Sequence, residues 1–174
     1  STWCRSSSRS GGTTWTAKVA RMLQPKVVTQ NIVAHLRTPR PRIWIISAPD
    51  PDGIICLNTI SVTHITDPRF SIYYLAAVLN SSLAAWFYYE FVFCRAVRTM
   101  HFDHYYAGKL PLALPHAGHL ERAESLTAAC ANTDEESLTR AQRQRLIDDF
   151  VFDAYSLNET QRRFVRHYCF ATPE

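Results

Sequence analysis

The chain of 174 residues can bury one sizeable core, because domains typically hold about 100–200 residues. Its 47% hydrophobic and 20% charged residues exclude wholesale disorder, and its five scattered cysteines, without a Cys-x-x-Cys pair, give no sign of a structural zinc or a redox centre. We therefore expect one domain with an appended helical piece, in a reducing compartment, the cytoplasm.

The net charge of +4 is unevenly distributed along the chain. From Glu121 onward ten acidic residues face seven arginines, whereas no acidic residue precedes Asp50. The basic residues of that N-terminal third are Arg5, Arg9, Lys18, Arg21, Lys26, Arg37, Arg40 and Arg42. A polyanion would therefore bind the N-terminal and central parts; the alternative is an ordinary solvated face.

Residues 1–24 predict a flexible, basic N-terminal segment. They are rich in Ser, Thr, Gly and Arg through Gly12 and lack the apolar core of a secretory signal. The first residue is Ser rather than Met, so we expect a fragment or a processed piece of something longer.

Residues 26–65 predict a small antiparallel sheet. Residues 26–33 mix Val and Ile with polar side chains, and residues 60–65 alternate apolar with polar side chains, as strands do. Residues 42–47 are β-branched and aromatic, residues 49–53 supply Pro, Asp and Gly for a turn, and residues 54–57 are apolar again. This pattern predicts a hairpin between 42–47 and 54–57.

From about Phe70 the apolar residues follow helical spacing, which predicts one helix of about five turns packed on the sheet. The segment Ile72–Phe93 is long enough to cross a membrane, but it contains Asn80, Ser81 and Ser82 at its centre, Glu90, and four tyrosines, so we reject that interpretation. Its aromatic residues favour core packing over the alternative, a stacking platform for single strands.

After residues 110–115 the pattern predicts a helical C-terminal extension. Thr133-x-x-Glu136 resembles a capping box before a helix, and Asn158 is placed to cap a final short helix. One face of the first helix should carry Leu146, Ile147, Phe150, Val151 and Ala154. The predicted fold class is α+β, with residues 1–24 flexible, residues 25–115 a module of sheet and long helix, and residues 116–174 a helical extension.

Two segments carry a family resemblance. Leu79–Leu83 reads Leu-Asn-Ser-Ser-Leu on the apolar helix, and Leu110–Leu112 reads Leu-Pro-Leu after a basic, aromatic stretch. These motifs resemble the TaqI-like C-terminal specificity domain of restriction-modification adenine-specific DNA methyltransferases. Leu146–Glu159 is similar to a tail that commonly follows, so the resemblance spans roughly Lys26 to Val165. It implies a module that recognises a DNA target within a phage-defence system.

The catalytic motifs of such enzymes do not occur in this sequence. An adenine methyltransferase similar to this family needs an Asn/Asp-Pro-Pro-Tyr/Phe motif and a Gly-rich loop for S-adenosylmethionine, and neither string is present. The resemblance therefore implies a non-catalytic chain without its own cofactor. Its partners would be double-stranded DNA and a methyltransferase domain, of the same or another chain, that binds S-adenosylmethionine and flips the target adenine.

The segment 93–106 is the predicted readout segment. Arg95 and Arg98 would share a face if the helix continued, and arginine suits bidentate contact with guanine. The alternative is that they only end an apolar helix, where its dipole favours cations. Arg40 and Tyr105 suit backbone contacts. The candidate DNA-binding residues are Lys26, Arg37, Arg40, Arg42, Arg95, Arg98, Thr99, His101, His104, Tyr105 and Lys109.

Two other functions compete with DNA recognition. His101-x-x-His104 and His116-x-x-His119 suggest a metal-dependent hydrolase, but no cysteine or glutamate stands at ligand spacing nearby, so we predict no metal site and no catalytic residue. The stronger competitor is a scaffold domain that docks a partner subunit through its apolar helix.

Overall fold

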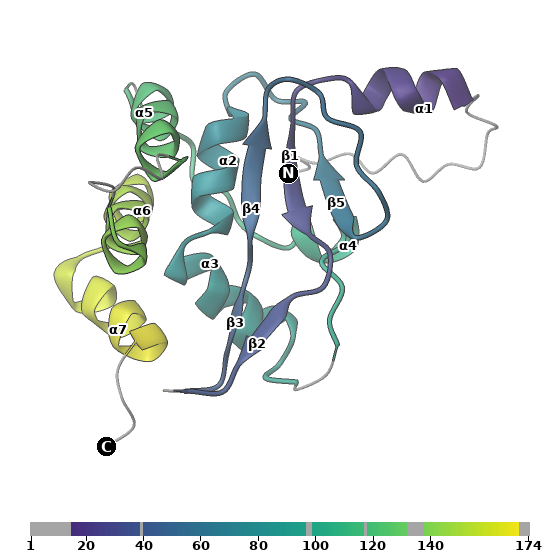
Figure 1. The fold of residues 1–174 in the computed structure, drawn as a ribbon. Helices are drawn as coiled ribbons and strands as arrows, with labels where there is room; N and C mark the ends of the chain where they lie inside the picture. The colour runs from purple at the N-terminus through teal and green to yellow at the C-terminus, as the bar shows by residue number, and fades with distance from the viewer. Residues whose placement is uncertain (1–14, 39, 97–98, 117, 132–137, 171–174) are drawn as a thin grey trace.

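The computed structural model describes residues 15–38, 40–96, 99–116, 118–131 and 138–170. It confirms the α+β class (Figure 1). The elements, in chain order, are α1 (Trp15–Met22), β1 (Lys26–Gln30), β2 (Ala34–Leu36), β3 (Arg42–Trp44), β4 (Ser47–Asp50), β5 (Ile60–Thr63), α2 (Ile72–Leu79), α3 (Ser82–Phe87), the π-helical turn η1 (Tyr88–Val92), α4 (His104–Ala107), α5 (His119–Ala131), α6 (Arg140–Ala154) and α7 (Glu159–Phe170).

The main sheet has the strand order β4-β1-β5, and both pairings are antiparallel. In the centre of the sheet Val28 lies between Ala48 of β4 and Val62 of β5. Strands β2 and β3 form a separate two-stranded hairpin, which extends from the sheet at the end of the molecule opposite α1 (Figure 1).

The predicted hairpin between residues 42–47 and 54–57 is wrong. Residues 54–57 form no strand, and β4 pairs with β1 instead. The chain turns after β4 because the Asp50 carboxylate accepts the backbone N–H groups of Gly53 and Ile54, at 3.0 and 2.8 Å. Gly53 adopts a φ of 79°, which glycine tolerates best. The apolar run at residues 54–57 is mostly exposed, so its apolar composition led to a wrong prediction of a strand.

The predicted five-turn helix is broken at Asn80 and Ser81. Ser81 is extended, with φ −77° and ψ 153°, and its hydroxyl accepts the Ala84 N–H at 3.1 Å, which caps α3. The Asn80 side chain accepts the Ser47 N–H at 3.0 Å and donates to the Ser47 carbonyl at 2.7 Å. Asn80 and Ser81 therefore form the break between α2 and α3, and the Asn80 side chain hydrogen-bonds this break to β4. In the described part of the chain, no helix is long and apolar enough to cross a membrane.

Helices α2 and α3 lie between the strands and the C-terminal helices (Figure 1). α2 contacts β4 and β1 on one side and α5 and α6 on the other, while α3 contacts β3, α6 and α7. Tyr74 and Tyr88 are fully buried in one core that also includes Phe150 and Val151. The interpretation of the segment's aromatic residues as core residues is therefore confirmed for these two tyrosines, but it is wrong for Phe91, which is 61% exposed.

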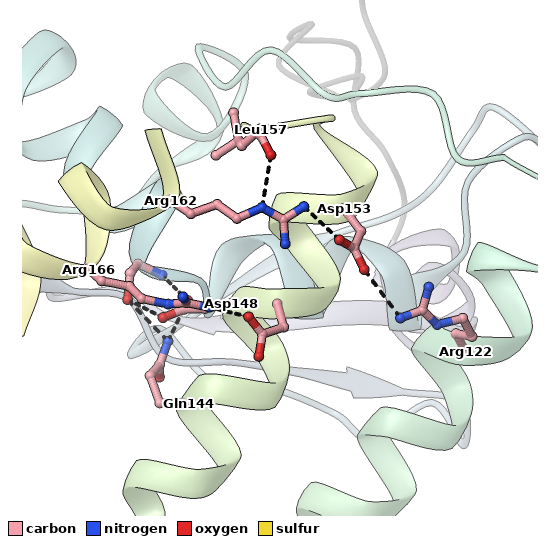
Figure 2. A network of polar contacts seen from close by, with 9 residues as sticks. Arg122, Gln144, Asp148, Asp153, Leu157, Arg162 and Arg166 are labelled. Carbon is pink, nitrogen blue, oxygen red and sulfur yellow. Dashed lines mark hydrogen bonds and ion pairs between the residues drawn. The ribbon is translucent and has the colours of Figure 1, made fainter. Parts of the chain in front are cut away.

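The three C-terminal helices are held together by a polar network (Figure 2). The Arg162 guanidinium donates to the Leu157 carbonyl at 2.8 Å and to Asp153 at 2.7 Å, and Arg122 of α5 lies 3.6 Å from the same carboxylate. In the same view Gln144 donates to Asp148 at 3.1 Å within α6.

Asp148 also connects α6 to Ser82, the first residue of α3. It accepts the Ser82 N–H at 2.8 Å and the Ser82 hydroxyl at 2.7 Å. Burial raises the pKa of this carboxyl above its ordinary value, and the hydrogen bonds from Ser82 and Gln144 only partly offset that effect. The extension and the module thus share one core and one buried polar contact.

The caps of the C-terminal helices differ partly from the predictions. α6 has a capping box formed by Thr139 and Gln142, whereas the predicted box at 133–136 lies outside the described residues. Asn158 and Gln161 exchange reciprocal hydrogen bonds at the start of α7, as predicted. On the predicted apolar face of α6, Phe150, Val151 and Ala154 are buried and Ile147 is partly buried, whereas Leu146 is 42% exposed. Within the N-terminal segment predicted to be flexible, residues 15–22 form α1.

Candidate nucleic-acid interface

Residues 99–109 present one polar and one apolar side. Thr99, His101, His104, Tyr105 and Lys109 are all exposed. The intervening apolar residues, which are buried in the core, are Met100, Phe102, Ala107 and Leu110. Five of the predicted DNA-binding residues therefore come from one segment and face solvent.

The backbone of this segment is fixed by contacts to two other parts of the chain, residues 31–33 and η1. The Val33 N–H donates to the Met100 carbonyl at 2.9 Å, and the Phe102 N–H donates to the Asn31 carbonyl at 2.6 Å. The Tyr88 hydroxyl donates to the Ala107 carbonyl at 2.8 Å from within the core. A surface built on such a fixed backbone can hold side chains in register with a ligand.

Helix α4 places an aromatic ring and a cation together. Asp103 caps the helix by accepting the N–H groups of Tyr105 and Tyr106, at 2.9 and 3.2 Å. The Lys109 ammonium lies 4.4 Å from the centroid of the Tyr105 ring, a cation–π contact. Lysine and tyrosine side chains are common donors to the sugar-phosphate backbone of DNA.

Arg95 lies in a turn after η1 rather than on a helix. Cys94 and Arg95 have φ values of 49° and 58°, so the condition for Arg95 and Arg98 to share a helical face is not met. Arg98 itself lies outside the described residues. The Arg95 side chain is 70% exposed and donates through Nε to Glu90 Oε2 at 2.8 Å, while Nη2 lies 2.7 Å from the same oxygen in an ion pair.

Glu90 accepts a second hydrogen bond on its other oxygen, from the hydroxyl of Tyr168 in α7. Burial raises the pKa of Glu90, but the hydrogen bonds from Arg95 and Tyr168 outweigh it, so that pKa is below its ordinary value. The pair with Glu90 in turn raises the pKa of Arg95. Both groups are therefore charged at neutral pH.

The β2–β3 hairpin carries three of the predicted arginines at different depths. Arg37 is exposed, and Arg40 Nη2 lies 3.3 Å from Nε2 of His167 in α7. Arg42 is buried and donates to the carbonyls of Thr38 and Arg40, at 2.7 and 3.1 Å. Arg42 thus organises the hairpin turn, while Arg37 is exposed and Arg40 is half-buried against α7.

Lys26 is the most deeply buried of the predicted cations that the structure describes. Its ammonium is fully buried, where it pairs with Asp50 and donates to the Met22 carbonyl. We leave Lys26 out of the candidate interface for this reason. The structure therefore brings together the five exposed residues of the 99–109 segment. Arg95 lies in the neighbouring turn, where the Phe93 and Tyr106 rings are 5.2 Å apart, whereas Arg37 and Arg40 lie on the β2–β3 hairpin.

The two histidine pairs lie in different surroundings. His101 pairs with Ile32 in an isolated β-bridge, and His119 Nδ1 accepts the backbone N–H of His116 at 3.0 Å. Among the described residues no group of three or more histidine, cysteine or carboxylate side chains is placed to hold a metal ion.

A family model described as the TaqI-like C-terminal specificity domain matches residues 3–112. The chain belongs to this family. The matched range contains all the candidate interface residues, from Arg37 to Lys109. It begins earlier and ends sooner than the resemblance predicted, so the Leu146–Glu159 segment lies outside it. No curated protein matches the chain.

Two residues of this surface were not predicted as site residues. Glu90 and Tyr168 hold Arg95, and they come from η1 and from α7. A signal for Glu90 exists in the sequence, because it is a lone acid in an apolar segment five residues before an arginine. Tyr168 gives no such signal, since it is 78 residues away from Glu90.

Proposed function

We propose that this chain recognises a short sequence of duplex DNA on behalf of an adenine-specific DNA methyltransferase. The methyltransferase domain, in the same or another chain, would bind S-adenosylmethionine and carry out the transfer. The observation that carries the proposal is the exposed polar side of residues 99–109, held on a fixed backbone within a member of a specificity-domain family.

The candidate groups divide by the contacts that they can make. The exposed Arg37 and Lys109, and the half-buried Arg40, are cations suited to phosphates, which position the protein and carry no sequence information. Arg95 and Thr99 are suited to base edges in the major groove, where a good bidentate arginine contact is worth about 1–3 kcal/mol of discrimination. Tyr105 lies beside Lys109 and suits the sugar-phosphate backbone.

The scaffold alternative requires a partner to dock on the apolar helix, but α2, the first part of that helix, is buried within this chain. Every residue from Tyr74 to Leu79 of α2 is buried within this chain, against the sheet on one side and α5 and α6 on the other. Helix α2 therefore has no free face for a partner subunit, although Phe91 of η1 is 61% exposed. DNA recognition is the better account of the exposed basic residues.

The test is the salt dependence of binding to a fluorescently labelled duplex. If cations at the surface bind phosphates, log affinity should fall linearly with log salt. Lys109→Ala should weaken binding about equally on all sequences and lower that slope by about one. A flat salt dependence, or no binding at low salt, would refute the proposal. Calorimetry should detect no S-adenosylmethionine binding by this chain alone.

A further inference from the structure

Three consecutive residues of α7 each contact a different part of the module. His167 lies against Arg40 of the β2–β3 hairpin, Tyr168 donates to Glu90 of η1, and the Cys169 thiol lies 3.6 Å from the Ser82 carbonyl of α3. α7 lies outside the residues that match the family. A helix outside the matched residues therefore contacts the region that carries Arg95.

The contacts at Glu90 divide its two oxygens between two partners. Oε1 accepts the Tyr168 hydroxyl, and Oε2 accepts the Arg95 Nε–H and lies 2.7 Å from Arg95 Nη2. The Glu90 side chain is 13% exposed, so it has little freedom, while Arg95 is 70% exposed. A carboxylate fixed at both oxygens can orient a guanidinium, whereas a carboxylate free to rotate cannot.

The orientation leaves one edge of the Arg95 guanidinium available. A guanidinium has five N–H donors in a rigid fork. Glu90 takes the side that carries Nε, and within the described part of the chain Nη1 makes no hydrogen bond. The edge formed by Nη1 and Nη2 is the one that suits the O6 and N7 atoms of guanine.

We propose that Tyr168 and Glu90 are positioning residues for Arg95, so that helix α7 sets the sequence preference of the DNA interface without touching DNA. The inference rests on the proposed function and adds a source of specificity outside the family's matched region. His167 and Cys169, on either side of Tyr168, hold the helix in place. Loss of the Tyr168 hydroxyl frees Glu90 to rotate and lets Arg95 sample other directions, with no change in net charge.

The experiment uses the full chain and a pool of duplexes with a randomised central stretch, because this probe requires no known target. Bound duplexes are recovered and sequenced, and the enrichment of each base at each position is compared between proteins. The wild-type chain should enrich guanine at one position. Tyr168→Phe should reduce that enrichment about threefold or more, part of the about 5- to 150-fold that a full bidentate contact provides.

A matched control removes a hydroxyl of the same kind elsewhere. The Tyr155 hydroxyl donates to the Pro111 carbonyl at 2.9 Å, away from Arg95. Tyr155→Phe should leave the enrichment unchanged, and the thermal midpoints of both variants identify any general loss of folding. Glu90→Gln, which frees Arg95 and removes a negative charge, should raise affinity for the unselected pool while it lowers the enrichment.

The outcomes separate this inference from the proposed function. If the wild-type chain enriches no sequence and shows no salt dependence, the proposed function itself fails. If the wild-type chain enriches a sequence and folded Tyr168→Phe enriches it equally, only the positioning role is overturned. A lower salt slope in Tyr168→Phe would also contradict it, because the variant changes the direction of a cation and not the number of phosphate contacts.

Discussion

Lys26 and Arg95 each form an ion pair with a carboxylate, Lys26 in the interior and Arg95 at the surface. Lys26 is fully buried against Asp50, and its remaining hydrogen bond goes to the Met22 carbonyl. Arg95 is 70% exposed against Glu90 and keeps an edge of its guanidinium in solvent. The inner pair satisfies its own charges and serves the fold, whereas the outer pair holds a cation that can still bind a ligand.

The largest expected effect comes from breaking the inner pair. Lys26→Met leaves the Asp50 carboxylate buried without its cation, which typically costs about 3–5 kcal/mol of unfolding free energy. Urea denaturation measures this loss. The DNA affinity of the folded fraction should not change. A loss below about 1 kcal/mol would contradict the assignment of Lys26 to the fold.

The turn that surrounds Asp50 provides the next effect. Gly53→Ala places a side chain at a φ of 79°, and its Cβ would lie 2.1 Å from the Leu23 carbonyl oxygen. Left-handed backbone in a non-glycine residue costs about 1–3 kcal/mol, and the clash adds to that cost. Gly118→Ala is the matched control, because Gly118 has a φ of 81° and nothing within 4 Å. Equal losses for both variants in thermal unfolding would exclude a role for the Leu23 contact.

The pH dependence of stability distinguishes the two deeply buried carboxylates. Burial raises the pKa of Asp50, but its hydrogen bonds with Lys26, Ile54 and Gly53 outweigh that effect, so the pKa is lowered and its stabilisation is lost only as the pH falls through the lowered value. Asp148 has a raised pKa, so its stabilisation is present at low pH and is lost as the pH rises through the raised value. Asp148→Asn should therefore gain stability relative to the wild type as the pH rises. Parallel denaturation curves of the two proteins at every pH would contradict this.

The smallest stability effect is expected at the outer pair. Arg95→Ala removes an exposed side chain and should change the unfolding free energy by no more than about 0.5 kcal/mol. Its effect on DNA should be larger, about 1–3 kcal/mol of lost preference at one base pair. Arg37→Ala, which removes another exposed arginine, should instead weaken binding to all duplexes about equally. A sharp fall in the thermal midpoint of Arg95→Ala would show that the pair with Glu90 serves the fold.

The sequence predicted those features that depend on residues close together in the chain. The alternation in residues 60–65 contains the observed β5, and Asn158 caps α7 through Gln161, three residues away. These features depend on short-range periodicity and on side chains close to the backbone that they cap.

The features that the sequence did not predict depend on distant partners. The helix breaks at Asn80 because its side chain binds the backbone of Ser47, 33 residues earlier, and Ser82 meets Asp148, 66 residues later. Lys26 resembles any basic residue of the N-terminal third until its pairing with Asp50, 24 residues away, is known. The sequence shows which side chains are charged, but it does not show which of them are buried.

The turn at Cys94 and Arg95 offers a place from which binding can be observed directly. Cys94 is exposed, whereas burial and then the nearby Asp148 raise the pKa of Cys169 to about 12, so the Cys169 thiol stays unreactive at neutral pH. In a Cys4→Ser, Cys56→Ser, Cys130→Ser background, a maleimide dye should therefore attach at Cys94 first. The dye would sit one residue from Arg95, and its emission would report when DNA reaches that side of the molecule.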